Sequence, residues 1–428
     1  MKKYLFILGL VGTALLTACS SADDLVADIP SPGLTEEEKA MIVEAGQDSD
    51  VPITLGVGQS RGYTRAVLNP DGNKNFITPA NKYLGVFCLA QGKQVGAPSI
   101  VPEDGDILWN NSEYAKWLDN IPAKVTNDGS KSRVTFLDAA TLSAPIPTDK
   151  ECYYPFGNWY YYDFFAYYPR QQASDSVWVG QGRVVVSYTI TGKEDIIWAR
   201  AAGGTSIPDP VTSNAVKSYS AKYMRLNPVV PEFSFDHKLT QFVFSVKPHF
   251  DDRVELNTKG FQVTKMEVID VYNQLELYVA DKTGGNHGAL KIKSLSTTDS
   301  LLVRMADGTD NQASPITVST TTDKDATVVA GITPKEVGYV LVPTSEMLTT
   351  AGYTNQYMVS IELAQTSGEK VPNTVVTLPL PPGGEYEAGK KYSITLEIYN
   401  PTNIQATATL ASWEDGYDNP DDGVIPVY

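Results

Sequence analysis

The sequence predicts an all-β protein with two β-sandwich domains in tandem, and three observations support this class. Apolar residues recur at every second position in many short runs, as in strands that place one face on a core. Gly, Pro, Asn and Asp separate these runs, which is typical of antiparallel sandwiches. Few segments have the period of a helix, and a chain of 428 residues is long enough for two or three domains.

The chain begins with an export signal. Lys2 and Lys3 precede an apolar run from Tyr4 to Leu16, which is too short for a stable membrane span. Small residues then lead directly to Cys19, in the pattern of a lipobox. This pattern resembles a bacterial lipoprotein signal over residues 1–18, which implies that Cys19 becomes the lipidated first residue. An ordinary signal peptide with a chance cysteine is the alternative.

The composition limits the class of partner. The formal net charge is −16 at pH 7, which argues against nucleic acid and anionic membrane surfaces as partners. Hydrophobic residues make up 42% of the chain, which is enough for ordinary cores. No apolar stretch after Leu16 approaches the ~18 residues of a membrane span, so the mature chain is expected to be soluble apart from its lipid.

Strands are predicted throughout the first half of the chain, after one short helix from Thr35 to Ala45. The stretch from Gly203 to Ser220, rich in Gly, Pro, Ser, Thr and Asn, is the best linker candidate. The two sandwiches are therefore expected at residues 66–210 and 211–428. The predicted strands of the first half are Ile53–Val57, Lys82–Ala90, Val134–Phe136, Tyr160–Tyr168, Val184–Ile190 and Asp195–Ala202.

A second block of strands follows. Phe233 to Leu239 alternates on one parity and Phe242 to Val246 on the other, which predicts a bulge or turn near Thr240 and Gln241. Asp281 to Asp325 is rich in Gly, Ser and Thr and is expected to hold long exposed loops. Further strands are predicted at Val263–Val271, Val337–Val342, Tyr357–Leu363, Val375–Leu380, Tyr392–Ile398 and Gln405–Trp413.

The sequence carries no pattern of a catalytic or metal site. The histidines, His237, His249 and His287, have no metal-ligand spacing, and no nucleophile elbow, phosphate loop or dinucleotide fingerprint occurs. His237 is expected to be packed or hydrogen-bonded within a strand, and the other two to lie in loops. The acidic stretch from Asp415 to Gly423 lacks the EF-hand spacing, so a solvated loop is favoured over a calcium site. We therefore predict no enzyme activity, no metal and no cofactor.

Two cysteines remain after Cys19. Export would permit a disulfide between Cys88 and Cys152, but one disulfide in so long a chain is not a scaffold that determines the fold. Cys88 lies in an apolar run, where a buried thiol is equally consistent with the pattern. Both possibilities stay open.

An aromatic block extends from Tyr153 to Tyr168, where eleven of sixteen residues are Tyr, Phe or Trp. If Trp159, Tyr161 or Tyr167 were exposed, the aromatic rings would form a stacking platform for sugars. A core strand with aromatic residues on both faces is the other interpretation, and we favour it.

Several short stretches follow one another in a fixed order over almost the whole mature chain, and together they form one further pattern. They are Ile53-Thr54-Leu55, Thr64-Arg65-Ala66, Phe164-Phe165-Ala166-Tyr167-Tyr168-Pro169, Asp195-Ile196-Ile197-Trp198-Ala199, Phe233-Ser234-Phe235-Asp236-His237-Lys238-Leu239, Leu341-Val342-Pro343 and Gly389-Lys390-Lys391-Tyr392-Ser393-Ile394-Thr395-Leu396, ending at Trp413. Together with the lipobox, this ordered set resembles the fimbrillin family, which builds type V pili. The resemblance implies two transthyretin-like Greek-key β-sandwich domains in tandem.

The resemblance also implies how such a subunit assembles. Residues 19–65 would form a propeptide whose first strand, with Ile53, Leu55 and Val57, fills a groove until a surface protease releases it. A strand from a neighbouring subunit would then replace it. Arg65 matches the position of cleavage in the family, and Arg61 is the second candidate. If neither is cut, the chain resembles a tip subunit that keeps its first strand.

The donor strand is expected at the C-terminus. Residues 424–428, with Val424, Ile425 and Val427, are short and apolar and follow an acidic stretch, so they could reach a neighbour. A final strand folded back on its own domain is the alternative.

The implied partners are other pilus subunits, the outer membrane through the lipid before processing, and host or bacterial surface receptors or glycans. The mature form would lie on the cell surface in a fimbrium and serve adhesion. A surface glycan-binding lipoprotein with an exposed aromatic platform is the competing hypothesis. A hydrolase of unrecognised type is a third, and no motif supports it.

Overall fold

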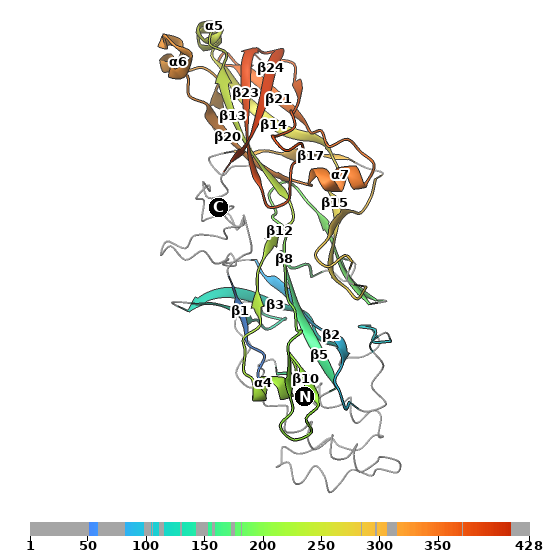
Figure 1. The fold of residues 1–428 in the computed structure, drawn as a ribbon. Coiled ribbons are helices and arrows are strands. Elements are labelled where there is room, and N and C mark those ends of the chain that lie inside the picture. The colour runs from blue at the N-terminus through green and yellow to red at the C-terminus, as the bar shows by residue number, and fades with distance from the viewer. Residues whose placement is uncertain are drawn as a thin grey trace.

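The computed structural model describes most of the chain after residue 50 (Figure 1). The described residues are 51–58, 82–97, 104, 106–110, 115–128, 131–142, 153–155, 159–172, 176–180, 182–283, 285–295, 298–305, 315–369 and 371–411. The predicted helix at Thr35–Ala45, Cys152 and the acidic stretch Asp415–Gly423 lie outside these ranges.

An eight-stranded sheet forms one end of the molecule (Figure 1). Its two end strands, β11 and β12, are separated along the chain only by Ser234 and Phe235, so residues 232–237 join the two ends of the sheet. In spatial order the strands are β11 (Glu232–Phe233), β1 (Leu55–Val57), β4 (Lys131–Phe136), β3 (Lys116–Asp128), β2 (Leu84–Lys93), β5 (Tyr160–Tyr168), β8 (Ile197–Ala201) and β12 (Asp236–His237).

A four-stranded sheet packs beside β5 and β8. It consists of β16 (Leu290–Ile292), β15 (Gln274–Asp281), β7 (Arg183–Thr189) and β6 (Val177–Gly180). The indole Nε1 of Trp198 on β8 donates to the carbonyl of Val279 on β15 at 2.9 Å. Alternate residues of β7 are buried, as their sequence pattern predicts, and buried residues of β15 close the core on this side with them.

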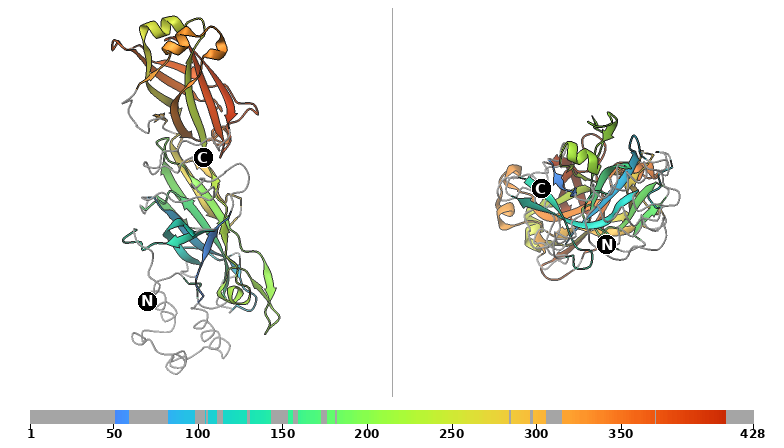
Figure 2. Two further views of the ribbon diagram at one scale, coloured as in Figure 1. Left: turned by 90° about the vertical axis from the view of Figure 1, so that its left-hand side faces the viewer. Right: turned by 90° about the horizontal axis from the view of Figure 1, so that it is seen from below.

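The other end of the molecule is a sandwich of two sheets, here called the C-terminal sandwich (Figure 2). Rings of Phe242, Tyr357 and Tyr386 meet edge to face in its core, with centroids 4.7–5.3 Å apart. One sheet has the order β18 (Arg304–Met305), β20 (Lys335–Val342), β13 (Thr240–Pro248), β23 (Lys391–Asn400) and β24 (Asn403–Ala411). The other has β17 (Asp299–Leu302), β14 (Phe261–Val271), β21 (Met358–Gln365) and β22 (Thr374–Thr377), with β19 (Ile316–Thr317) beside β14.

Helices are short in the described ranges. They are α4 (Ala221–Leu226), α5 (Arg253–Lys259), α6 (Thr321–Asp325), the 3₁₀ turn η3 (Val329–Gly331) and α7 (Ser345–Thr350). None of them is both long and apolar enough to span a membrane. The all-β class is therefore confirmed, while the transthyretin-like arrangement stays a prediction.

The chain passes between the two ends of the molecule at three places: from β12 to β13, from β14 to β15, and from β16 to β17. Contacts reinforce this junction. The amide of Leu341 donates to the carbonyl of Gly192 at 2.7 Å, and Asn273 Nδ2 donates to Asp299 Oδ2 at 3.0 Å. Gly192 has φ 95°, and a Cβ there would lie 2.6 Å from a methyl group of Val340. The close approach of the two ends therefore requires glycine at this position.

Two sequence interpretations are wrong in this part of the chain. The stretch from Gly203 to Ser220 is not a linker but forms the hairpin of β9 (Ser206–Pro208) and β10 (Ala215–Lys217), followed by α4. Phe233 to Leu239 is not one strand, because β11 pairs with β1 and β12 pairs with β8. Turn residues and alternation are present as described, but they do not specify which strand becomes the partner.

Two further expectations concern the same region. The stretch from Asp281 to Asp325 contains β16 to β19 and α6 among its described residues, so it is more than loop. Strands on both sides of residue 210 pair within one sheet, as β7 does with β15. The division into residues 66–210 and 211–428 stays a prediction.

Candidate functional site

Strand β1 is flanked on both sides within the eight-stranded sheet. It pairs antiparallel with β4, where Leu55 faces Val134 and Val57 faces Ser132. On its other side it pairs in parallel with β11, and Gly56 N donates to the carbonyl of Pro231 at 2.9 Å. Removal of β1 would leave two strand edges facing one another across the width of one strand. We call the position that β1 fills between β4 and β11 the β1 slot.

The side chains of the first strand supply core packing. Ile53, Leu55 and Val57 expose only 5%, 2% and 8% of their surfaces. Full burial of one aliphatic side chain stabilises a fold by about 1.5–3 kcal/mol, so the three together contribute roughly 5–9 kcal/mol. This is comparable with the whole free energy of unfolding of a typical domain, about 5–15 kcal/mol. The slot therefore needs an occupant with apolar residues at alternate positions.

Little space remains beside the backbone at Gly56 and Gly58. A Cβ at Gly56 would lie 3.2 Å from Cγ1 of Val230 and 3.3 Å from Cγ of Glu232. A Cβ at Gly58 would lie 3.0 Å from Oε2 of Glu232. The slot therefore favours small residues between the apolar ones.

The start of the first strand is fixed by backbone contacts. The carbonyl of Val51 accepts from Tyr154 N at 2.8 Å, and Pro52 forms a bridge with Tyr153. The indole of Trp117 donates to the carbonyl of Tyr153 at 2.6 Å. Segment 51–58 is thus held at its start by these contacts and at its end by the β1 slot.

The remaining residues of the predicted assembly site lie outside the described ranges. They are the lipidation residue Cys19, the cleavage candidates Arg61 and Arg65, and the donor-strand residues Val424, Ile425 and Val427. Residue 58 is the last described residue before the stretch that contains both arginines.

The part of the aromatic block from Tyr160 to Tyr168 is a core strand, as we favoured. It forms β5, which lies between β2 and β8, and Tyr167 is fully buried. The Tyr167 hydroxyl donates to Asn120 Oδ1 at 2.8 Å, and burial raises its pKa. Trp159 and Tyr161 are partly exposed, and the Lys217 ammonium lies 4.4 Å from the Tyr161 ring centroid. Tyr167 is therefore not available to a stacking platform, whereas Trp159 and Tyr161 are partly accessible.

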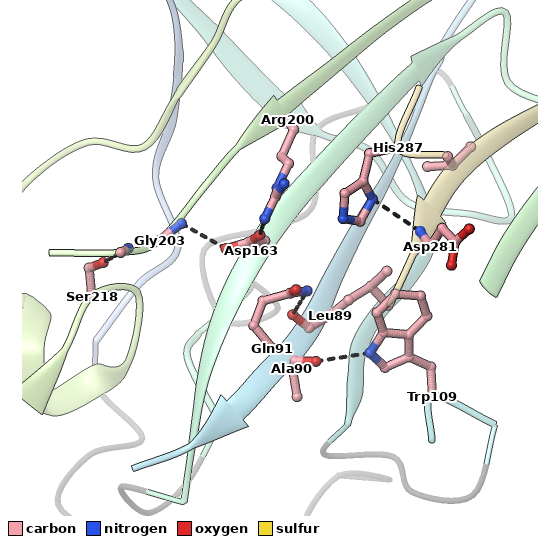
Figure 3. Close-up of polar contacts among 12 residues, drawn as sticks. Leu89, Ala90, Gln91, Trp109, Asp163, Arg200, Gly203, Ser218, Asp281 and His287 are labelled. Carbon is pink, nitrogen blue, oxygen red and sulfur yellow. Dashed lines mark hydrogen bonds and ion pairs between the residues drawn. The ribbon is translucent and has the colours of Figure 1, made fainter. Parts of the chain in front are cut away.

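One group of polar side chains beside β5 is paired (Figure 3). Asp163 on β5 is fully buried and accepts from Arg200 Nε at 2.7 Å and from Gly203 N at 2.7 Å. Burial raises the pKa of the Asp163 carboxyl, and the charge of Arg200 opposes that rise. This group fixes the end of β8 against β5, which is a structural role.

His287 belongs to a neighbouring turn (Figure 3). Its Nδ1 accepts from Asp281 N at 3.0 Å, and its ring centroid lies 5.3 Å from that of Phe165. Burial, followed by the charge of Arg200, lowers the pKa of His287 to about 4. The imidazole is therefore neutral at physiological pH and acts as an acceptor in the turn.

The other two histidines also have structural contacts. His237 is 8% exposed and its Nδ1 contacts Asp195 Oδ2, which confirms the expectation of a hydrogen-bonded core histidine. His249 lies after β13, stacks on Tyr399 with centroids 4.0 Å apart, and contacts Asp252 at 2.9 Å. Across the described residues, no group of three His, Cys, Asp or Glu side chains is placed to hold a metal ion.

Comparisons with known proteins place these features in context. A family model described as fimbrillin-like matches residues 116–413. No curated protein sequence matches the chain.

Three solved structures are among those that match the chain. A candidate cell adhesion protein from Bacteroides uniformis is 12% identical, with a TM-score of 0.41 over 85% of this chain and 99% of that one. The tip fimbrial protein Mfa3 from Porphyromonas gingivalis is 10% identical, with a TM-score of 0.34 over 85% and 99%. The fimbrial anchor protein Mfa2 from the same organism is 10% identical, with a TM-score of 0.29 over 85% and 98%. These low scores add nothing to the family match.

Proposed function

The chain belongs to the fimbrillin-like family, and on that premise we propose that it is a structural subunit of a surface pilus that joins its neighbours by exchange of strand β1. The observation that supports this proposal is the β1 slot. A three-residue strand fills a gap between β4 and β11, its side chains complete the core, and an undescribed stretch with two arginines follows it.

The proposed sequence of events begins with export. The signal over residues 1–18 is removed, Cys19 is lipidated, and the precursor is held at the outer membrane by its lipid. A protease that cuts after arginine then cleaves at Arg65, or at Arg61, in the stretch that follows β1. The covalent link between segment 19–65 and the rest of the chain is thereby broken, and residues 51–58 are then retained only by their noncovalent contacts with the fold.

Strand exchange would restore the backbone pairing and the apolar burial that are lost when β1 leaves the slot. An incoming strand from a neighbour would form ladders with β4 and β11 and place apolar side chains where Ile53, Leu55 and Val57 lie. Loss of β1 without replacement would cost roughly 5–9 kcal/mol of apolar burial, so replacement must accompany release. We propose residues 424–428 as the donor, in which Ile425 and Val427 stand at alternate positions and would insert on one face, while Val424 would lie on the other face of the strand.

Cleavage is tested on the purified precursor without its lipid. An arginine-specific protease should produce a new N-terminus after Arg65 or Arg61, followed by ladders on a native gel and filaments in the electron microscope. Arg61→Ala/Arg65→Ala should remain uncut and monomeric, and Arg225→Ala should behave as the unmodified chain. A cut chain that stays monomeric would contradict the exchange proposal, and an uncut chain would indicate a tip subunit.

A disulfide lock tests release of β1 separately from cleavage. Val57 and Ser132 face one another across β1 and β4, so Val57→Cys/Ser132→Cys should form a disulfide that holds β1 in its slot. The oxidised variant should be cleaved yet stay monomeric, and a reductant should then allow polymers to form. Thr395→Cys/Thr407→Cys is the matched control, because these residues face one another on β23 and β24, away from the slot. Polymers from the oxidised slot variant would show that β1 does not leave.

A further inference from the structure

A polar groove lies between the eight-stranded and four-stranded sheets, and no part of the assembly proposal uses it. Its volume is about 690 Å³. One wall is the chain before β2, with Lys82 and Tyr83, and the segment after β5, with Arg170. The opposite wall is β7 and Gln274 on β15. Sites for small ligands have volumes of about 300–1,000 Å³, so one or two sugar rings would fit.

The groove concentrates positive charge on a strongly acidic chain. Lys82, Arg170 and Lys293 line it, whereas the formal charge of the whole chain is −16. The carboxylate of Glu194, which also lines it, accepts from Thr191 N at 2.8 Å and from Thr191 Oγ1 at 2.9 Å.

The three cations differ in how they are held. Arg170 donates from Nε to the carbonyl of Asn120 at 2.9 Å, which fixes the guanidinium, and its partial burial lowers its pKa. Lys293 donates to Ser187 Oγ at 2.7 Å and lies 3.6 Å from Glu276. Lys82 is exposed. A positioned guanidinium with an ammonium nearby suits a carboxylate, because charge-assisted hydrogen bonds are the stronger ones.

The neutral lining suits hydroxyl groups. Gln171, Gln172, Gln274 and Thr189 also line the groove. Tyr83 is partly exposed at the same wall, and the Lys124 ammonium lies 5.2 Å from its ring centroid. Amides and hydroxyls both donate and accept, which matches sugar hydroxyls and does not match an apolar ligand.

We infer that this groove binds an acidic saccharide, with Arg170 and Lys82 on the carboxylate and the glutamine amides on the sugar hydroxyls. The inference goes beyond the proposed pilus role, and it requires neither cleavage nor strand exchange. It is therefore tested on the uncut monomer, where failure of assembly has no influence on the result.

The experiment titrates the uncut, unlipidated chain with trigalacturonate and, as the matched neutral probe, with its methyl ester. Calorimetry should show binding of the acid at least about tenfold tighter than binding of the ester. Arg170→Gln should weaken binding of the acid about tenfold, and the exposed Lys82→Gln by a few fold. Lys259→Gln on α5 removes the same charge at the other end of the molecule and should change nothing (Figure 1).

Several results would overturn the inference. Equal affinity for acid and ester would show that charge does not select the ligand. An equal loss in Lys259→Gln would show that only net charge matters. Competition by inorganic sulfate at the same concentration as the saccharide would show an anion site without sugar recognition. Absence of binding to either probe would remove the inference altogether. Because Arg170→Gln loses a hydrogen bond to Asn120, Arg170→Lys provides a second variant that keeps the charge and should retain part of the affinity.

Discussion

The eight-stranded sheet and the C-terminal sandwich build their cores in different ways. In the sandwich the central strands are long: β13 pairs with β23 over eight residues, and β14 pairs with β21 over eight. In the eight-stranded sheet the strands near its two ends are short, with three pairs between β1 and β4 and two between β1 and β11. A strand with few ladder bonds is retained mainly by its buried side chains. Such a strand is separable in a way that β13 or β14 is not.

The largest expected effect is the difference in stability between the same substitution in the β1 slot and at an exposed position of β24. Leu55→Asp places a carboxylate in the core where 2% of the side chain is exposed, and should lower the free energy of unfolding by about 4–5 kcal/mol. Leu410→Asp on β24 is the matched substitution, because Leu410 is 54% exposed, and should cost less than about 0.5 kcal/mol. Urea denaturation of both variants measures the difference. Equal stability would mean that β1 contributes little to the core.

The second prediction asks whether the two regions unfold separately. Phe244→Ala on β13 removes a fully buried ring from the C-terminal sandwich and should cost about 3–5 kcal/mol. The described tryptophans, among them Trp117 and Trp198, all belong to the other end of the molecule. Because the chain crosses the junction at three places, we expect the two ends to unfold together.

Tryptophan fluorescence measures whether the eight-stranded end unfolds together with the sandwich. The measurement is made in a Trp413→Phe background, because Trp413 lies outside the described ranges. The midpoint of the fluorescence transition should fall along with that of far-ultraviolet circular dichroism. An unchanged fluorescence midpoint would show that the eight-stranded sheet folds independently of the sandwich.

The third prediction concerns pH. Because His287 has a folded pKa of about 4, below its ordinary value of 6.5, its contribution to stability is complete above pH 6.5 and is lost as pH falls toward 4. The ring is partly exposed, and solvent screening limits the loss to about 1–2 kcal/mol. His287→Gln keeps an acceptor for Asp281 N and should flatten the pH dependence between 7 and 4.5. His249→Gln is the control, and a flattening of the same size there would exclude His287 as the cause.

The smallest expected effect lies in the C-terminal sandwich. Thr320 caps α6, accepting from Asp323 N, while the Asp323 side chain accepts from Thr320 N at 2.7 Å. Thr320→Ala should cost about 1 kcal/mol, measured by thermal unfolding. Thr320→Ser keeps the hydroxyl and should restore most of that loss. A cost above about 3 kcal/mol would mean that this short helix supports the sandwich more than its length suggests.

The sequence predicted the positions of the strands better than it predicted which strands pair with one another. Alternation or apolar runs located β5, β7, β14 and β23 to within a few residues, because they reflect the burial of one or both faces of a strand. Phe233 to Leu239 alternates equally well but is divided between β11 and β12, since the same pattern is satisfied in either place. The parity change near Thr240 coincides with the break between β12 and β13, where Leu239 lies in a bend.

The candidate sites were predicted unevenly for a similar reason. Burial of Ile53, Leu55 and Val57 followed from alternation, whereas the presence of β11 beside β1 did not, because it depends on a segment more than 170 residues away. The groove around Arg170 had no signal in the sequence. Its residues come from separate loops and strands, and only the folded chain brings them together.

The triple crossing between the two ends of the molecule has a mechanical consequence. A pull along the long axis is shared by the segments β12–β13, β14–β15 and β16–β17, so no single segment bears the whole tension (Figure 2). Bending at the junction would have to displace these segments together and break the bond between Leu341 and Gly192. We therefore expect the junction to resist bending more strongly than a single connecting segment would.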